Sequence, residues 1–272
     1  MVASGTLGVC VSGALGGVGR ALVRAVAAAD DLRLHSVVSR SQTGRDIGEA
    51  LGGAALGVAL ESDLAAALDR APDVLIDYTH PTAVRRNVAL ALERRIPVVI
   101  GTSGLYDEDF AKIDAAARAA DVGVATGNFS LTAALLQHLG KIAARHVARF
   151  EVIEHNGAGK PDAPSGTARE LAELLARERG PLPAEPPVEL IGPPEARGAS
   201  FAGVPVHSVR LPGSNPRVEV IFGAPGERLT IRHEEQGDPS IFVAGTLLAA
   251  RRVQGMAGLV RGLDSLLFSG HV

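Results

Sequence analysis

Hydrophobic and polar positions alternate regularly over the first 130 residues of the chain. Short runs of consecutive apolar residues are separated by longer segments in which apolar positions recur with helical spacing. The runs lie at 6–12, 34–39, 96–104 and 122–129, a further buried strand that ends at Asp77 is expected within 67–79, and the helical segments lie at 20–31, 81–94 and 108–120. Strands that are apolar throughout and alternate with helices predict a parallel sheet covered on both faces. We therefore expect an α/β fold with a doubly wound sheet of the Rossmann type.

The pattern changes after Ser130, where a long helical segment precedes a strand, a loop and another helix. Runs with the alternation of antiparallel strands follow, and a last helix is expected at 240–252. The helices lie at 131–147 and 167–179, and the strands at 149–156, 204–211, 217–224 and 227–235. This order predicts an α+β second domain, residues 131–239, with a mixed or antiparallel sheet. Residues 1–130 and 240–272 are expected to form the first domain.

A glycine-rich turn joins the first predicted strand to the first predicted helix. Gly13, Gly16 and Gly19 recur at every third position, with Gly17 and Val18 between the last two. Small residues at such a turn let backbone N–H groups at a helix N-terminus approach a pyrophosphate closely. A glycine triplet alone is weak, since ordinary turns also collect glycine. Its place after the first strand of a βαβ unit favours dinucleotide binding by the first domain.

The end of the second predicted strand distinguishes between the two nicotinamide dinucleotides. A carboxylate at this point would bind the ribose 2′-hydroxyl of NAD, whereas this chain has Ser39 and Arg40 there. Arg40 can pair with a 2′-phosphate, and no carboxylate is present to repel one. NADPH is therefore the expected cofactor, with NADH left open. The alternative is that Arg40 is a solvated loop residue.

The composition excludes several kinds of partner. The formal net charge is −3 with both signs interspersed, so neither nucleic acid nor a membrane surface is expected to bind. No apolar stretch approaches the roughly 20 residues of a membrane-spanning helix. The spacing of cysteine and histidine gives no metal site. Because Cys10 is the single cysteine, no intrachain disulfide can form, and we expect a cytoplasmic protein.

The segment from Glu154 to Ala168 carries the most specific chemistry in the chain. It combines a strand end, a loop with Lys160, and Ser165-Gly166-Thr167 at the start of a helix. Free N–H groups and two hydroxyls at a helix N-terminus, next to an ammonium, favour carboxylate binding. Lys160 is one of only three lysines, and an arginine would serve any general surface role, so a compact ammonium, or a group whose pKa can fall on burial, is indicated. Lys160 could also donate a proton. For Ser165 and Thr167 the alternative is plain N-capping, which is compatible with ligand binding.

The run KPDAPSGTA at 160–168 resembles the signature of the 4-hydroxy-tetrahydrodipicolinate reductase (dihydrodipicolinate reductase) family, NAD(P)H-dependent enzymes of bacterial lysine and diaminopimelate biosynthesis. The resemblance extends over essentially the whole chain and includes GALGGVGR at 13–20, IDYTHP at 76–81, VIGTSG at 99–104, GNFS at 127–130 and HSVRLPG at 207–213. It implies hydride transfer from a nicotinamide to an unsaturated cyclic dicarboxylate, with a proton from the protein. It also implies a homotetramer, formed through the sheet of a substrate-binding and oligomerisation domain.

The resemblance assigns roles to two sets of residues. The substrate carboxylates are implied to lie against Lys160, Ser165, Gly166 and Thr167. The nicotinamide side is implied to include Gly101, Thr102, Ser103, Gly127, Asn128 and Phe129.

The chain departs from the family pattern just before the lysine. That pattern is Glu-x-His-His-x-x-Lys, with the first histidine regarded as the general acid, and its two histidine positions are Asn156 and Gly157 here. His155 lies one residue early, and on a strand this offset turns a side chain to the opposite face. Asn156 can hydrogen-bond a substrate, and Lys160, His155 or water is left to supply the proton.

Three functions remain open at this stage. The first is the lysine-pathway reductase itself, and the second is a paralogue that reduces another unsaturated imine or enone acid. The third is a nucleotide-binding protein without turnover. Lys160 favours the two enzymes over the third.

Overall fold

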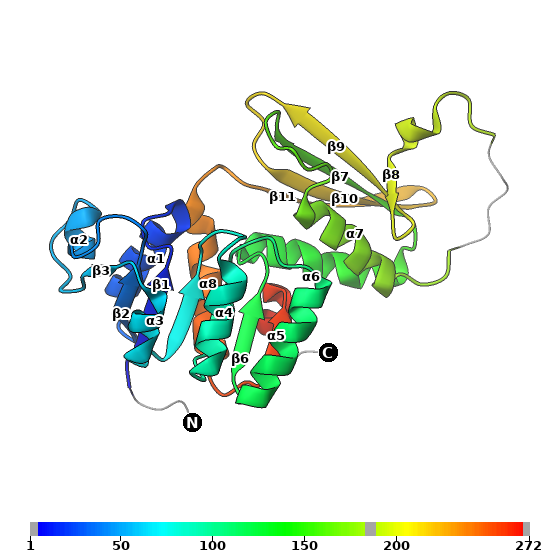
Figure 1. The fold of residues 1–272 in the computed structure, drawn as a ribbon. Helices are drawn as coiled ribbons and strands as arrows, with labels where there is room; N and C mark the ends of the chain where they lie inside the picture. Colours follow the sequence, from blue (N-terminus) through cyan, green and yellow to red (C-terminus); the bar gives the residue numbers. More distant parts are fainter. Residues whose placement is uncertain (1–4, 183–188, 269–272) are drawn as a thin grey trace. The chain divides into compact units, whose positions relative to one another are not determined.

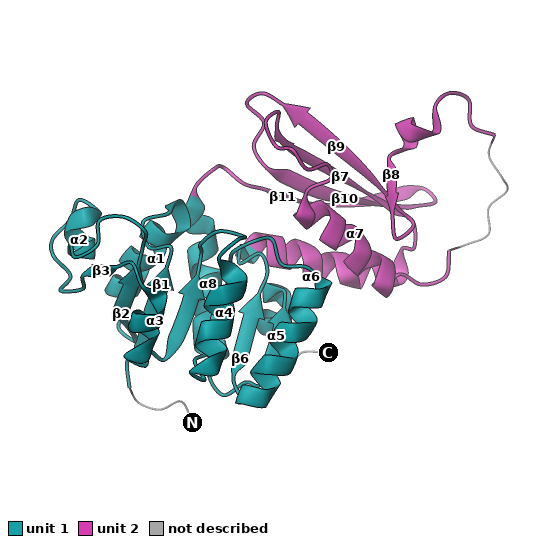
Figure 2. Ribbon diagram, in the orientation of Figure 1, with its two compact units in different colours: residues 1–131, 239–272 teal, residues 132–238 magenta. Residues whose placement is uncertain are grey.

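The computed structural model describes residues 5–182 and 189–268. The chain forms two compact units, shown in Figure 2. Unit 1 comprises residues 1–131 and 239–272, and unit 2 comprises residues 132–238. Each unit has its own sheet and its own apolar core.

A seven-stranded parallel sheet forms the centre of unit 1 (Figure 1). Its strands are β1 (Leu7–Ser12), β2 (Leu32–Val38), β3 (Leu60–Glu61), β4 (Val74–Asp77), β5 (Val98–Ile100), β6 (Gly123–Thr126) and β12 (Gly258–Arg261). They lie in the order β12-β6-β5-β4-β1-β2-β3. Succession along the chain reverses direction between β1 and β4, and ligands of open α/β sheets bind at the carboxyl ends of the strands at such a point.

Helices cover both faces of this sheet, which confirms the predicted Rossmann-type fold. One packed group is α1 (Gly17–Ala28), α8 (Val243–Arg252) and α9 (Leu263–Phe268), and the other is α3 (Leu64–Asp69), α4 (Val84–Glu93) and α5 (Asp107–Ala120) (Figure 1). The short helices α2 (Ile47–Ala50) and η2 (Pro239–Phe242) complete the unit. Buried strand residues such as Leu75 and Val98 pack against Val88 of α4 and Ala117 of α5. Burial on both faces is why the central strands are mostly apolar.

Unit 2 is built on a five-stranded mixed sheet, as the sequence predicts. Its strands are β7 (Phe150–Gly157), β8 (Ala199–Phe201), β9 (Val204–Leu211), β10 (Arg217–Ala224) and β11 (Glu227–Glu234), in the order β11-β10-β7-β9-β8. The neighbours β7 and β9 are parallel, and the other neighbouring pairs are antiparallel. The remaining elements are α6 (Leu131–His146), α7 (Gly166–Glu178) and the 3-10 helix η1 (Pro194–Arg197).

Helix α7 packs across one face of the second sheet because it carries an apolar stripe at helical spacing. Leu171 and Leu175 are fully buried in a core with Phe150 and Val152 of β7. A Cβ at Gly140 of α6 would lie 3.1 Å from Cδ2 of Leu175, so the glycine permits the close approach of the two helices. Residues of β7 alternate between this covered face and an open face.

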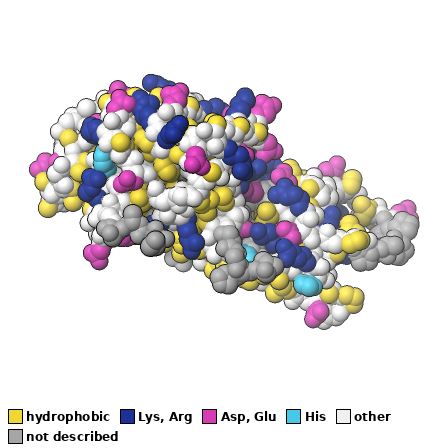
Figure 3. All heavy atoms as spheres, turned by 90° about the horizontal axis from the view of Figure 1, so that it is seen from below, with side chains coloured by type: hydrophobic (Ala, Val, Ile, Leu, Met, Phe, Trp, Pro, Cys, Tyr) yellow, Lys and Arg dark blue, Asp and Glu magenta, His cyan; other side chains and the backbone are white. Residues whose placement is uncertain are grey.

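The described surface carries charges of both signs. Figure 3 shows basic and acidic side chains mixed over the face that it draws. No helix within residues 5–182 and 189–268 combines the length and apolar character needed to cross a bilayer. In the same ranges, no group of three or more His, Cys, Asp and Glu side chains is arranged to hold a metal ion.

Candidate functional site

The turn between β1 and α1 brings backbone segments into close contact. Gly13 has a φ of +86°, and a Cβ there would lie 2.0 Å from the carbonyl oxygen of Tyr78. A Cβ at Gly19 would lie 2.1 Å from the carbonyl oxygen of Gly13, so neither position accepts a larger residue without a shift of the backbone. The N-cap residue Gly16 has no side chain to bond the first N–H groups of α1, and the first turn holds no acidic residue. This helix N-terminus is therefore suited to an anion.

Two cavities share Gly16, Tyr78 and Thr79 in their walls. The smaller, of about 310 Å³, is also lined by Gly17, Val18, Gly19, Pro81, Gly101, Thr102 and Ser103. The larger, of about 1030 Å³, has walls that include Gly13, Ser39, Arg40, Asp63, His80, Arg86 and Asn87. Nine of the predicted cofactor residues therefore line these two cavities: Gly13, Gly16, Gly17, Val18, Ser39, Arg40, Gly101, Thr102 and Ser103.

Cationic side chains enter the wall of the larger cavity. Arg40 follows the end of β2, and Arg86 comes from α4. Asp63 lines the same cavity, but its Oδ1 accepts the N–H of Ala65 at 2.9 Å as the N-cap of α3. The arrangement therefore offers a phosphate two guanidinium groups.

A buried carboxylate joins the loops that follow β4 and β5. Asp77, the last residue of β4, is fully buried. Its Oδ1 accepts hydrogen bonds from Oγ1 of Thr102 at 2.5 Å and of Thr79 at 2.8 Å. Its Oδ2 accepts one from Nδ2 of Asn87 at 2.7 Å. Because Thr79 and Thr102 line the smaller cavity, Asp77 fixes two of its walls from behind.

We expect Asp77→Asn to lower the free energy of unfolding by about 2–3 kcal/mol, since hydrogen bonds to a buried charge are lost. The new amide nitrogen would face the amide donor of Asn87. The double variant Asp77→Asn with Asn87→Asp restores a donor–acceptor pair with reversed polarity and should recover part of the loss. Urea denaturation of both variants measures this, and equal destabilisation of the two would contradict the pairing.

The predicted residues after β6 lie beside this region without lining it. Ile100 of β5 pairs with Thr126 of β6, so Gly127 leaves the sheet next to Gly101. The side chain of Phe129 is buried, and Oδ1 of Asn128 accepts the N–H of Ser130 at 2.9 Å. Within the described chain, Gly127, Asn128 and Phe129 share the sheet edge but are not part of either cavity wall.

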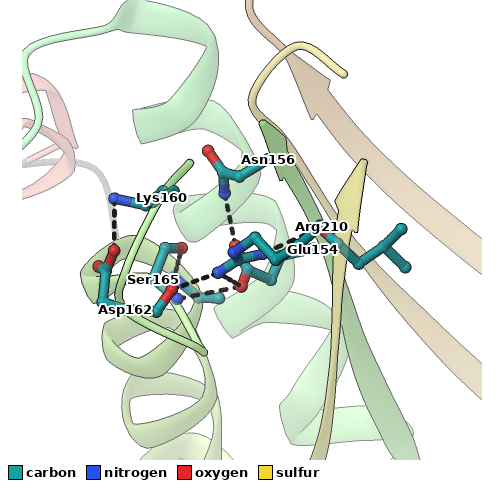
Figure 4. A network of polar contacts seen from close by, with 8 residues as sticks. Glu154, Asn156, Lys160, Asp162, Ser165 and Arg210 are labelled. Carbon is teal, nitrogen blue, oxygen red and sulfur yellow. Dashed lines mark hydrogen bonds and ion pairs between the residues drawn. The ribbon is translucent and has the colours of Figure 1, made fainter. Parts of the chain in front are cut away.

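A second polar network lies in unit 2, where β7 and β9 meet the start of α7 (Figure 4). Glu154 is fully buried, and its Oε1 accepts from Nη2 of Arg210 at 2.6 Å and from the N–H of Ser165 at 3.1 Å. Its Oε2 accepts from Nδ2 of Asn156 at 2.7 Å. Burial opposes ionisation, but hydrogen bonds from Arg210, Ser208 and Ser165 outweigh it and hold the pKa of Glu154 below its usual value. The group is therefore a carboxylate that only accepts hydrogen bonds.

Lys160 lies in the loop between β7 and α7. Its Nζ pairs with Oδ1 of Asp162 at 2.9 Å, where the two side chains are 37% and 47% exposed. The hydrogen bond from Lys160 holds the pKa of Asp162 below its usual value. Exposed ion pairs contribute only about 0–1 kcal/mol. Lys160 can therefore exchange Asp162 for the carboxylate of a ligand at little cost.

The start of α7 supplies further hydrogen-bond donors. Oγ of Ser165 accepts the N–H of Ala168 at 3.3 Å, so Ser165 is the N-cap of the helix. The first turn holds no acidic residue. The N–H groups of Gly166 and Thr167 find no acceptor among the described residues. Together with Lys160, this segment is suited to a carboxylate.

The structure does not bring His155 together with the other predicted residues of unit 2. Glu154 and Asn156 are buried on the covered face of β7, and His155 lies on the open face. There the guanidinium of Arg217, from the neighbouring β10, donates to Nε2 of His155. Burial and the Arg217 cation lower the pKa of His155. Lys160, Asn156, Ser165, Gly166 and Thr167 gather around the Glu154 network without it.

Asp77 and Glu154 are not among the residues that the sequence predicts for either site. A signal for both was present, because each is an acidic residue at a position expected to be buried. Asp77 ends an apolar run, and Glu154 follows Phe150 and Val152 at the spacing of two that places all three on one face. Buried carboxylates need several donors, so such positions point to a network.

The Glu154 carboxylate should make stability depend on pH. Its pKa is lower in the folded protein than the ordinary value of 4.5, so its stabilisation is fully present above that value and is lost as the pH falls through the folded pKa. We expect Glu154→Gln to reduce the loss of unfolding free energy on acidification below about pH 4.5. Urea denaturation at several pH values measures this, with Glu151→Gln on the open face of β7 as control. An unchanged acid dependence in Glu154→Gln would contradict the assignment.

The comparisons with known proteins agree over nearly the full length of the chain. The family model described as dihydrodipicolinate reductase, N-terminus, matches residues 7–129, and the one described as dihydrodipicolinate reductase, C-terminus, matches residues 131–267. The 4-hydroxy-tetrahydrodipicolinate reductase of Moorella thermoacetica is 41% identical over 265 residues, which cover 96% of this chain and 98% of that protein. That of Thermosynechococcus vestitus is 42% identical over 272 residues, covering 96% and 97%.

Solved structures give the same result. The dipicolinate-bound dihydrodipicolinate reductase from Paenisporosarcina sp. TG-14 superposes with a TM-score of 0.81 at 30% identity, covering 96% of this chain and 99% of that one. An amine dehydrogenase from Mycobacterium smegmatis, at 15% identity and a TM-score of 0.66, shares the fold alone. The chain belongs to the dihydrodipicolinate reductase family.

Proposed function

We propose that this protein reduces 4-hydroxy-tetrahydrodipicolinate to tetrahydrodipicolinate in lysine and diaminopimelate biosynthesis. The observation that carries the proposal is the carboxylate-binding arrangement of unit 2, in which Lys160 lies close in sequence to the free N–H groups of Gly166 and Thr167. Relatives of about the same length that carry this activity in their names are 41% and 42% identical to the chain.

NADPH is the proposed cofactor. Gly13 and Gly19 keep the turn after β1 free of side chains, and the N-terminus of α1 is suited to a pyrophosphate. Arg40 follows β2 where NAD-specific sites carry an acid, which supports a 2′-phosphate there. When bound, NADPH supplies the hydride.

The residues of unit 2 bind the acid and supply the proton. Lys160 and the N-terminus of α7 neutralise a substrate carboxylate, which orients the ring. Loss of the 4-hydroxyl as water, with addition of one hydride and one proton, converts the substrate to tetrahydrodipicolinate. Lys160, or a water molecule bound to it, is the proposed source of that proton. His155 is left out of the proposed reaction because it lies on the open face of β7.

A second candidate is a paralogous reductase that acts on another unsaturated cyclic acid. Asn156 and Gly157 favour it, because they occupy the two positions at which the family pattern has histidines. An asparagine amide cannot act as a general acid near neutral pH. A positioned acid contributes about 10²–10⁴-fold to a rate, so its loss slows a reductase without abolishing hydride transfer.

Turnover tests the two candidates directly. The substrate is generated in situ with its synthase, NADPH and the protein are added, and NADPH absorbance is followed. Consumption at an ordinary enzymatic rate, on the order of 1–10³ s⁻¹, is the result expected for the lysine-pathway enzyme. NADPH binding without consumption would contradict it in favour of a reductase for another acid.

We also propose a cytoplasmic homotetramer. Glu151, Ile153 and His155 of β7 lie on the face of the second sheet opposite the buried residues and are partly exposed. Such a face is a suitable surface for a second copy of the chain. Light scattering that gave a monomer mass would contradict this assembly.

A further inference from the structure

We propose that Asn156 determines substrate specificity by presenting its amide oxygen, as a hydrogen-bond acceptor, to an N–H or O–H group on the substrate ring. The proposal rests on the proposed function in so far as the substrate is the acid bound by Lys160 and the start of α7. The new claim is that the substrate ring must carry a hydrogen-bond donor. The contact of Asn156 with Glu154 uses one N–H of its amide nitrogen and leaves the amide oxygen to face the ligand.

The orientation of the Asn156 amide is fixed by its neighbour. Nδ2 of Asn156 donates to Oε2 of the buried Glu154 at 2.7 Å. A carboxylate has no proton to donate, so the nitrogen and not the oxygen of the amide must face it. Figure 4 shows the amide oxygen of Asn156 directed away from Glu154.

Glu154 is itself held rigidly. Its other oxygen, Oε1, accepts from Arg210 at 2.6 Å and from the N–H of Ser165 at 3.1 Å. Arg210 pairs with Asn156 across the parallel strands β7 and β9, and Ser165 caps α7. A rotation of the carboxylate would therefore break contacts to two elements. Glu154 is a positioning residue that acts through Asn156.

The amide oxygen of Asn156 is left for a ligand. Asn156 is 8% exposed, and its Oδ1 finds no donor within the described part of the chain. An acceptor repels the carboxylates of the proposed substrate, so the group opposite must carry a hydrogen. On a hydroxylated cyclic imine that group is the hydroxyl or the protonated ring nitrogen. A ligand that covers this oxygen without donating to it leaves a buried acceptor unpaired, which disfavours ligands without such a group.

Two unreactive dicarboxylates with rings of the same size test the proposal. Piperidine-2,6-dicarboxylate carries N–H donors on its ring at neutral pH, whereas the ring nitrogen of dipicolinate carries no hydrogen. The readout is the ratio of the two dissociation constants, measured by calorimetric titration of the NADPH-loaded protein. Differences between the two rings that do not involve Asn156 affect the ratio equally in every variant. A change of the ratio between variants therefore reports on Asn156.

Glu154→Gln is the decisive variant because it inverts the amide. The Gln oxygen can keep the bonds from Arg210 and Ser165, which both reach Oε1. Its nitrogen then takes the place of Oε2, and the Asn156 amide must turn to accept from it. We expect the ratio to move toward dipicolinate by about tenfold or more. The matched control Glu151→Gln, on the open face of the same strand, should keep the ratio of the unmodified protein.

Equal weakening of both ligands in Glu154→Gln, or an unchanged ratio, would overturn the proposal. Should Glu154→Gln not fold, Asn156→Leu removes the acceptor and should weaken piperidine-2,6-dicarboxylate about tenfold without weakening dipicolinate. Loss of affinity for both ligands in Asn156→Leu would again overturn the proposal.

The turnover assay separates this proposal from the proposed function. A shift in the ratio without turnover of 4-hydroxy-tetrahydrodipicolinate refutes the proposed substrate but supports the role of Asn156 as an acceptor. Turnover with an unshifted ratio supports the proposed substrate but refutes that role.

Discussion

Replacement of Lys160 by alanine is expected to lower kcat by about 10²–10⁴-fold, the usual contribution of a positioned proton donor. The dissociation constant for NADPH should stay unchanged, because Lys160 belongs to unit 2 and every predicted nucleotide residue belongs to unit 1. Steady-state kinetics and titration with NADPH measure the two quantities. Lys112→Ala, in α5, serves as the control for loss of one lysine.

Lys160→Arg separates the two roles of this side chain. An arginine keeps the positive charge but does not release a proton near neutral pH. We therefore expect KM for the acid to remain close to that of the unmodified protein while kcat falls as it does in the alanine variant. Loss of NADPH affinity together with turnover, in either variant, would contradict the assigned role.

Replacement of Arg40 by aspartate is expected to reverse the cofactor preference from NADPH toward NADH. The change removes the proposed charge-assisted bond to the 2′-phosphate and supplies a carboxylate that can accept from the 2′-hydroxyl of NADH. A bond of that kind contributes about 1.5–3 kcal/mol, so the ratio of kcat/KM for the two cofactors should change by roughly 10–100-fold.

The control for this variant is Arg45→Asp, in the same loop region. Arg45 bonds to Gln42 and to the carbonyl of Glu49, and it is not part of the wall of either cavity. The same change of charge is thereby made at a position that does not line the site. A cofactor ratio that is unchanged in Arg40→Asp, or equally changed in Arg45→Asp, would contradict the 2′-phosphate assignment.

The larger elements of the fold could be predicted because their burial leaves a clear pattern. Strands such as β4 and β5 are buried on both faces and are made mostly of apolar residues, and α7 carries a single apolar stripe. The short elements β3, β8 and β12 gave no such signal. Unlike β4 and β5 they are only partly buried, so they form no continuous apolar run, and their place is set by pairing with neighbouring strands.

Boundaries at the functional turns were also harder to predict. The apolar run at 96–104 continues past the strand, because β5 ends at Ile100 and Gly101 begins a loop. A Cβ at Gly101 would lie 2.0 Å from Cζ of Tyr78. The glycine is required by contact with a distant part of the chain, which local sequence patterns do not report.

The candidate sites could be predicted from the sequence only in part. Residues expected to bind through the backbone, such as Gly13, or to follow a strand, such as Arg40, are recognisable from their place in the sequence. The partners of Glu154 were not, because Arg210 lies on a strand 56 residues away. Only the parallel pairing of β7 with β9 brings Arg210 beside Asn156.

The most direct test of the central claim is to trace the hydride itself. NADPH carrying deuterium at the transferable position of C4 is supplied with 4-hydroxy-tetrahydrodipicolinate generated in situ, and the product is analysed by mass spectrometry. The proposed reaction predicts tetrahydrodipicolinate that contains one deuterium atom, formed at the rate at which NADPH is consumed. Unlabelled product, or no product while NADPH still binds, would contradict reduction of this acid by the protein.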